Sequence, residues 1–157
     1  MVGRRDELLA VATTVGAADA TINGAQTDVS SAIADLTNGL GADIVIESVG
    51  GRASTMEVAA AAAAPGGQIG VLGAIVGDVA VAYPIANRKE LTIKLVNSYS
   101  TWQGVREFQI ALDLIADGRV QAEPLITHRF ALDQIADGFV AADDKRASGA
   151  LKVIIQP

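Results

Sequence analysis

The strongest constraint on the fold is the apolar run Ile44-Val45-Ile46, which glycines enclose on both sides. An unbroken apolar run of this length is typical of a strand covered on both faces, as in a parallel sheet. Small and polar residues follow from Glu47 to Gly51, at the carboxyl end where open parallel sheets bind their ligands. The stretch therefore predicts a central strand of an α/β sheet.

The next residues predict a strand–helix–strand unit. Ser54-Thr55-Met56-Glu57 has the pattern of a capping box at the head of an alanine-rich helix. Pro65-Gly66-Gly67 is expected to end that helix, and Gln68 to Leu72 to form the following strand. The same alternation of helix and strand along the chain predicts parallel pairing with crossover connections.

Two further helices have candidate capping residues. Asp28 is expected to cap a helix that carries Ile33, and Asp133 to cap the last helix, which ends near Ala142. Gly138 would then lie inside a helix, at a cost of about 1 kcal/mol relative to alanine.

Composition and charge exclude several classes of function. The chain has 157 residues, half of them apolar, so it can bury a sizeable core. Its net charge of −6 argues against nucleic acid and anionic membranes as partners. It has no cysteine and a single histidine, His128, and therefore no metal site is expected within it. The start has no signal-peptide pattern and no apolar run is long enough to cross a membrane, so we expect a cytoplasmic protein.

Several blocks of the chain, in order, resemble the medium-chain dehydrogenase/reductase family, in particular its zinc-type alcohol dehydrogenase branch. The blocks are Gly41 to Gly51, Ala64 to Gly67, Arg88 to Lys94, Pro124 to Phe130 and Leu151 to Pro157. The zinc-free quinone reductase branch shares the glycine and proline blocks, and the Leu-Ile-Thr-His-Arg-Phe block favours the alcohol dehydrogenase branch. Family members are more than twice this length, so the chain is similar to their C-terminal portion.

The resemblance implies a Rossmann-like α/β fold whose parallel sheet lacks its first βα unit. It implies a partial dinucleotide-binding domain over residues 1–97, and the C-terminal segment of the catalytic domain over residues 98–157. The glycine-rich turn for the pyrophosphate and the ligands of the catalytic zinc would lie outside this sequence.

The resemblance also implies which end of the chain meets the adenosine ribose of the cofactor. Gly3 stands where dinucleotide-binding sheets carry an acidic residue for the ribose hydroxyls, and Arg4 and Arg5 follow it. Arginine binds phosphate through two hydrogen bonds, so this replacement favours a 2′-phosphate, and hence NADP over NAD. The alternative is a pair of solvated arginines near the terminus.

The other implied cofactor positions are mostly strand ends. They are Ser48, Val49, Gly50, Leu72, Gly73, Ala74, Val96, Ser98 and Lys152. Glycine at 50 and 73 would let a ribose or ring approach closely, or would simply turn the chain. His128, Asp43 and Glu47 are expected to be structural, so no catalytic residue is assigned.

Two functions remain open. The first is an oxidoreductase that transfers a hydride between NAD(P) and a small alcohol or carbonyl substrate, with this chain supplying part of the cofactor site and no zinc ligand. The second is a non-catalytic dehydrogenase module that acts through homo-oligomerisation or with a missing N-terminal portion. Val79 to Tyr83 is an apolar candidate for an edge strand in such an assembly.

Overall fold

The computed structural model describes residues 1–51, 54–97 and 99–157. They form two compact units, which are described separately. The central unit consists of Val2 and Ile22–Ser100, and the terminal unit of Met1, Gly3–Thr21 and Thr101–Pro157. A short strand, β1 (Val2–Gly3), opens the chain.

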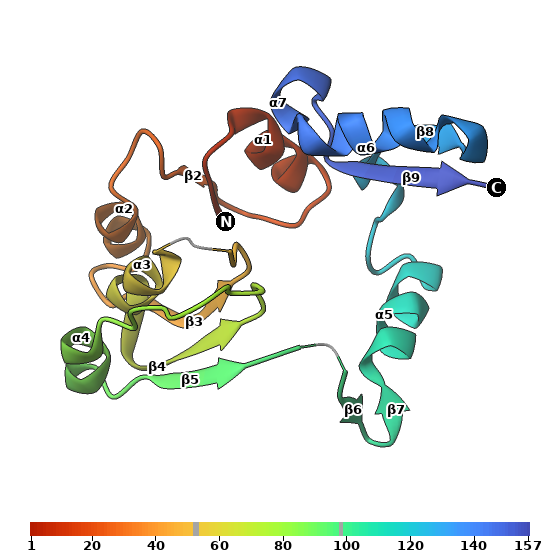
Figure 1. The fold of residues 1–157 in the computed structure, drawn as a ribbon. Helices are drawn as coiled ribbons and strands as arrows, with labels where there is room; N and C mark the ends of the chain where they lie inside the picture. The colour runs from red at the N-terminus through yellow and green to blue at the C-terminus, as the bar shows by residue number, and fades with distance from the viewer. Residues whose placement is uncertain (52–53, 98) are drawn as a thin grey trace. The chain divides into compact units, whose positions relative to one another are not determined.

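The central unit is built around a three-stranded parallel sheet with the strand order β3-β4-β5 (Figure 1). Helices connect its successive strands, which confirms the predicted α/β alternation. The elements in chain order are β2 (Ile22–Asn23), α2 (Val29–Leu36), β3 (Ala42–Glu47), α3 (Thr55–Ala62), β4 (Ala63–Val71), α4 (Tyr83–Arg88) and β5 (Thr92–Leu95).

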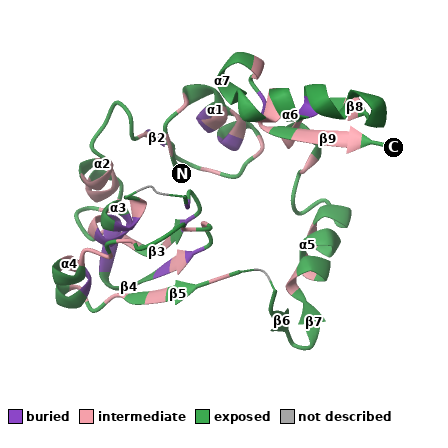
Figure 2. Cartoon of the chain, viewed as in Figure 1, coloured by how far each residue is buried: buried purple, intermediate pink, exposed green. Residues whose placement is uncertain are grey.

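One face of this sheet makes the core of the central unit. Val45 pairs with Ile69, and Ile69 with Ile93, so the three side chains share a face. They pack with α3, whose Met56 and Ala60 are almost fully buried. Figure 2 shows the buried residues of this unit gathered on α3 and β4.

The predicted helix starts have different outcomes. Asp28 caps α2 as predicted, because its carboxylate accepts the N–H of Ser31 at 2.8 Å. The capping box at Ser54 is wrong, since Ser54 has ψ 32° instead of extended backbone and its side chain makes no cap hydrogen bond. The hydroxyl of Thr55 instead donates to Glu47, 2.8 Å away.

Two other segments differ from prediction. Pro65-Gly66-Gly67 lies within β4, which begins at Ala63, and a shift in the β3–β4 register accommodates the extra residues. Val79 to Tyr83 is not an edge strand. Val79 and Val81 pack against the core of the central unit instead, and Ala82, with φ 50°, leads into α4.

The C-terminus of α3 is capped by a lysine from outside the helix. The ammonium of Lys89 donates to the carbonyls of Ala60, Ala61 and Ala63 at 3.1, 2.7 and 2.6 Å. A cation at this position satisfies orphan carbonyls and opposes the negative end of the helix dipole. Partial burial, and then the charge of Arg88, lower the pKa of Lys89.

We expect Lys89→Met to lower the free energy of unfolding by about 1–2 kcal/mol, because the buried carbonyls would lose their donor. Lys94→Met removes the same charge from an exposed position on β5 and serves as the control. Urea denaturation of both variants measures the difference. Equal stability of the two would show that the Lys89 cap contributes nothing.

The terminal unit contains a second, smaller parallel sheet of β8 and β9. Its β6 and β7 form an antiparallel pair, an exception to the predicted parallel pairing. The elements are α1 (Asp6–Thr14), β6 (Thr101–Trp102), β7 (Val105–Arg106), α5 (Glu107–Ala116), η1 (Glu123–Leu125), β8 (Ile126–Ala131), η2 (Leu132–Gln134), α6 (Ile135–Asp143), α7 (Lys145–Ser148) and β9 (Lys152–Gln156).

The packing of α6 explains why Gly138 is tolerated inside this helix. A Cβ on Gly138 would lie 2.7 Å from Cδ1 of Ile155 and 3.4 Å from the ring of Phe130, so the missing side chain lets α6 approach β8 and β9 closely. The predicted cap at Asp133 is wrong, because Asp133 lies inside η2 and α6 begins two residues later.

Candidate functional site

The carboxyl ends of β3, β4 and β5 lie side by side and form the candidate site. The N–H of Leu72 donates to the main-chain oxygen of Glu47 at 2.8 Å, and that of Val96 to Val71 at 2.9 Å. The loops beyond the strands are also joined, since the N–H of Gly51 donates to Ala74 at 2.8 Å. We call this edge the strand-tip site. It brings together the predicted residues Ser48, Val49, Gly50, Leu72, Gly73, Ala74 and Val96.

Glycines 50 and 73 are required by the approach of the two loops to each other. Gly50 has φ +64°, and a Cβ there would lie 2.6 Å from the backbone nitrogen of Ala74. A Cβ on Gly73 would lie 2.4 Å from the backbone nitrogen of Gly50. The sequence predicted that these glycines either let a ligand approach or turn the chain. In the structure, their missing side chains let the two loops pack against each other.

A buried carboxylate holds the strand-tip site together. Glu47 is the last residue of β3 and only 4% exposed, the one buried charged residue among those described. Its Oε1 accepts the N–H groups of Val49 and Gly50 at 2.8 and 3.1 Å and the hydroxyl of Thr55 at 2.8 Å. One side chain thus fixes the exit of β3 and the start of α3.

The environment of Glu47 favours its charged form. Burial raises the pKa of Glu47, but the Thr55 hydroxyl and the nearby N–H groups of Gly50, Val49 and Gly73 together bring the pKa below its ordinary value. Its Oε2 has no hydrogen-bond partner among the described residues and faces Gly73. A carboxylate that accepts several N–H groups is held ionised at neutral pH.

The strand-tip site is open to solvent around this buried centre. Val49 is 70% and Leu72 52% exposed, and Ser48 and Ala74 are also exposed. Exposed apolar side chains next to main-chain polar groups suit a ligand that has both flat rings and hydroxyl groups. The geometry is therefore suited to orienting a nucleotide-like molecule, and among the described residues of the site we assign no acid–base or nucleophilic group.

The other predicted cofactor residues do not belong to the described part of the central unit. Gly3 ends β1, and Arg4 is exposed. Arg5 is half-buried, and its guanidinium donates to the main-chain oxygen of Lys145 at 3.3 Å. Lys152 is exposed at the start of β9. These residues belong to the terminal unit, and Ser98 lies outside the described residues.

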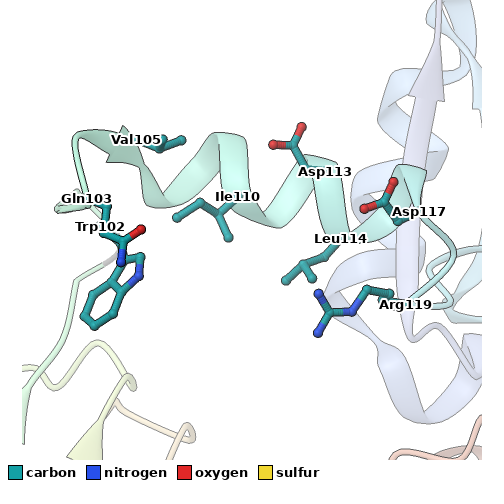
Figure 3. Close-up of a pocket in the computed structure, with 8 residues that line it drawn as sticks. All are labelled: Trp102, Gln103, Val105, Ile110, Asp113, Leu114, Asp117 and Arg119. Carbon is teal, nitrogen blue, oxygen red and sulfur yellow. The ribbon is translucent and has the colours of Figure 1, made fainter.

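A pocket of about 350 Å³ lies in the terminal unit, beside the β6–β7 pair and α5 (Figure 3). Trp102 and Arg119 stand at its opposite ends, and Ile110 and Leu114 project from α5 between them. None of the predicted cofactor residues lines it. The strand-tip site therefore remains the candidate.

The residues do not fit a catalytic zinc ion. The chain has no cysteine, and in residues 1–51, 54–97 and 99–157 no three metal-ligating side chains form a group that could hold a metal. His128 stacks on Phe130, with ring centroids 6.2 Å apart, and its Nδ1 lies 2.9 Å from the hydroxyl of Thr127. Within the same described ranges, no helix has the length and apolarity needed to cross a membrane.

Sequence reasoning predicted a structural role for Glu47 but not its partners, and it missed the role of Lys89. Glu47 had a detectable signal, because a carboxylate that directly ends an apolar strand must find donors or remain exposed. Lys89 had none, since its partners precede it by 26 to 29 residues in the chain.

Comparison with known proteins identifies the family. Residues 1–117 match the family model described as zinc-binding dehydrogenase, so the chain belongs to the zinc-type alcohol dehydrogenase family. It is 32% identical over 123 residues to the zinc-type alcohol dehydrogenase-like protein YdjJ of Escherichia coli. It also resembles a solved Escherichia coli oxidoreductase of unknown specificity, with 26% identity and a TM-score of 0.85 over 99% of the chain.

The match covers only part of each relative. It spans 78% of this chain but 33% of YdjJ, and 42% of the solved oxidoreductase. An alcohol dehydrogenase of Escherichia coli CFT073 solved with NADH matches 99% of this chain with 25% identity and a TM-score of 0.82, over 43% of its own length. The shared portion thus has the Rossmann-like fold of longer dehydrogenases.

Proposed function

We propose that this chain forms one wall of a nicotinamide-dinucleotide site in an oxidoreductase that transfers a hydride between the cofactor and a small alcohol or carbonyl compound. The observation that carries the proposal is the alignment of three parallel strand ends, where Gly50, Gly73 and Val96 meet at one edge. Open α/β sheets bind nucleotides at this edge.

The described residues would act by binding and orienting. Main-chain groups of the strand-tip site would hold the cofactor, Val49 and Leu72 would pack against its rings, and Glu47 would keep the two loops in place. The dinucleotide, when bound, supplies the hydride chemistry. The zinc ligands and the substrate pocket would come from polypeptide outside these residues, and we propose residues 1–97 and 98–157 as its partial cofactor and catalytic domains.

We further propose that the cofactor is NADP and that Arg4 and Arg5 bind its 2′-phosphate. Arg4 is exposed, and Arg5 makes a single long hydrogen bond at 3.3 Å, which leaves guanidinium donors for a phosphate. Support for NAD comes from the relative that was solved with NADH. The proposed location is the cytoplasm, where these cofactors are available.

Titration of the purified chain with NADPH and NADH tests the proposal, with binding measured by calorimetry and by fluorescence of the single tryptophan, Trp102. We expect the double variant Arg4→Gln/Arg5→Gln to weaken NADPH binding about tenfold, equivalent to about 1.4 kcal/mol, and to leave NADH binding within about twofold. The loss of two phosphate-binding guanidinium groups is the cause.

The matched control is Arg106→Gln/Arg146→Gln, which removes the same charge from exposed positions. If both double variants weaken NADPH equally, the effect is long-range electrostatics and not a phosphate site. Absence of binding of either cofactor up to several millimolar would overturn a cofactor role for this polypeptide.

A further inference from the structure

The pocket beside the β6–β7 pair is lined by a different side of α5 from the one that carries the exposed apolar residues of this helix. Ile110, Leu114 and Asp117 line the pocket, and their spacing of four and three residues places them on one side of the helix. Phe108 and Leu112 are exposed, do not line the pocket and lie on another side. The pocket is therefore a feature separate from the apolar surface of α5.

The β6–β7 pair forms the second wall of the pocket. Gln103 and Gly104 join its two strands with φ 51° and φ 81°, as in the two-residue turns that suit a hairpin. This turn holds Trp102 at the end of β6, where the residue is 67% exposed. Its indole therefore offers an aromatic surface at one end of the pocket (Figure 3).

The turn that ends α5 shapes the other end of the pocket. Gly118 has φ 70°, and the N–H groups of Arg119 and Val120 both donate to the main-chain oxygen of Leu114, at 3.0 and 3.1 Å. Such a turn is a common helix C-terminus, and here it brings Arg119 back to the last turn of the helix. Arg119 and Asp117 thus stand at this end as exposed groups of opposite charge.

These two charged side chains are not paired in the part of the chain that the structure describes. Among those residues, neither Asp117 nor Arg119 takes part in an ion pair or a side-chain hydrogen bond. Asp113, the other charged residue of the described lining, already accepts a hydrogen bond from the amide of Gln109 at 2.7 Å. The pocket therefore presents an unpaired anion and an unpaired cation at one end, and an indole at the other.

We infer that this pocket binds a free α-amino acid with an apolar side chain. The carboxylate of the ligand would pair with Arg119 and its ammonium group with Asp117. Its side chain would lie over the half-buried Leu114 and Ile110, towards the indole of Trp102. A volume of about 350 Å³ suits one small ligand. Both ionic contacts are made by exposed groups, so we expect an affinity in the millimolar range.

This site goes beyond the proposed cofactor role and does not depend on it, because no predicted cofactor residue lines the pocket. Titration with L-phenylalanine tests it, measured by calorimetry and by the fluorescence of Trp102, the single tryptophan. We expect saturable binding. Phenethylamine and hydrocinnamate each keep the ring and one of the two charges, so each should bind about fivefold more weakly or worse.

Asp117→Asn and Arg119→Gln should each weaken L-phenylalanine binding about fivefold, because each removes one ionic contact. The matched controls are Asp137→Asn and Arg106→Gln, which remove the same charges from exposed residues that do not line the pocket. They should leave binding within about twofold. Circular dichroism verifies that the variants fold, and one folded pocket variant is sufficient for the comparison.

Three outcomes overturn the inference. The first is no binding of L-phenylalanine up to several tens of millimolar, and the second is binding that the pocket variants weaken no more than the controls do. The third is equally tight binding of an analogue that carries a single charge, which would show that the pocket does not recognise an amino acid. The NADPH titration is a separate measurement, so failure of either proposal is distinguished from failure of the other.

Discussion

The variant Gly73→Ala is expected to lower the free energy of unfolding by about 3 kcal/mol or more. A methyl group at this position would lie 2.4 Å from Oε2 of Glu47 and 2.4 Å from the backbone nitrogen of Gly50. Both neighbours are fixed, the first by burial and the second by its own hydrogen bond to Oε1. The loops at the ends of β3 and β4 would have to separate, so we also expect the variant to lose any cofactor binding by the strand-tip site.

Gly70→Ala is the matched control for this steric effect. It lies in β4, three residues earlier, and the nearest atom to its added methyl group would be Cδ1 of Ile46, at 3.1 Å. That atom ends a flexible, exposed side chain, so we expect a change within about 1 kcal/mol. Chemical denaturation measures both variants. If Gly73→Ala is as stable as Gly70→Ala, the two loops are not packed as the structure has them.

Glu47→Gln is expected to cost about 3 kcal/mol of stability. The change keeps the size of the side chain but removes its charge, and it replaces one carboxylate oxygen by an amide that donates hydrogen bonds. The groups around Oε1 are donors too, namely the N–H groups of Val49 and Gly50 and the Thr55 hydroxyl. The amide oxygen can take the place of Oε1 and still accept from these donors, but the amide NH2 group then replaces Oε2 beside the N–H of Gly73. The remaining bonds also lose the strength that the charge gave them, and water cannot reach the buried NH2 group.

The same carboxylate predicts a dependence of stability on pH. Because the folded-state pKa of Glu47 is lowered, its contribution is fully present above the unfolded-state pKa of about 4.3. The contribution is lost as the pH falls through the lower folded-state value. We expect wild-type stability to fall in this acidic range more steeply than that of Glu47→Gln, as measured by urea midpoints at successive pH values.

Asp43→Asn is the control, because Asp43 is exposed on the same strand. It should retain the acid sensitivity of the wild type. If Glu47→Gln also retains it, the stabilisation at neutral pH comes from other carboxylates. A neutral Glu47 in the native state would then contradict the site geometry described above.

The fold could be predicted where a local sequence pattern is compatible with one kind of structure only. The glycine-bounded apolar run became β3, Asp28 capped α2, and the alternation of helix and strand gave parallel pairing of β3, β4 and β5. Local competition caused the misses. Ser54 has a backbone conformation that does not suit an N-cap, and its side chain makes no cap hydrogen bond. The hydroxyl of the next residue, Thr55, donates to the carboxylate of Glu47.

The candidate site was predictable only in outline. Strand ends could be located from the sequence, and parallel strands must end at one edge, so the meeting of Gly50, Gly73 and Val96 followed from chain order. The reason why positions 50 and 73 are glycines could not be predicted, because it is a contact between two loops more than twenty residues apart in the chain. The packing of Val79 and Val81 into the core, where an edge strand was expected, has the same cause.

The sequence by itself determined the family of this protein, its α/β class and the residues at its strand ends, because these depend on local periodicity, glycine placement and block order. Only the tertiary structure decided that Glu47 is the buried centre of the site and that Lys89 caps α3. Each of these depends on which distant segment lies opposite a residue. The burial of a residue and its hydrogen-bond partners depend on that distant segment, so a local sequence pattern does not predict them.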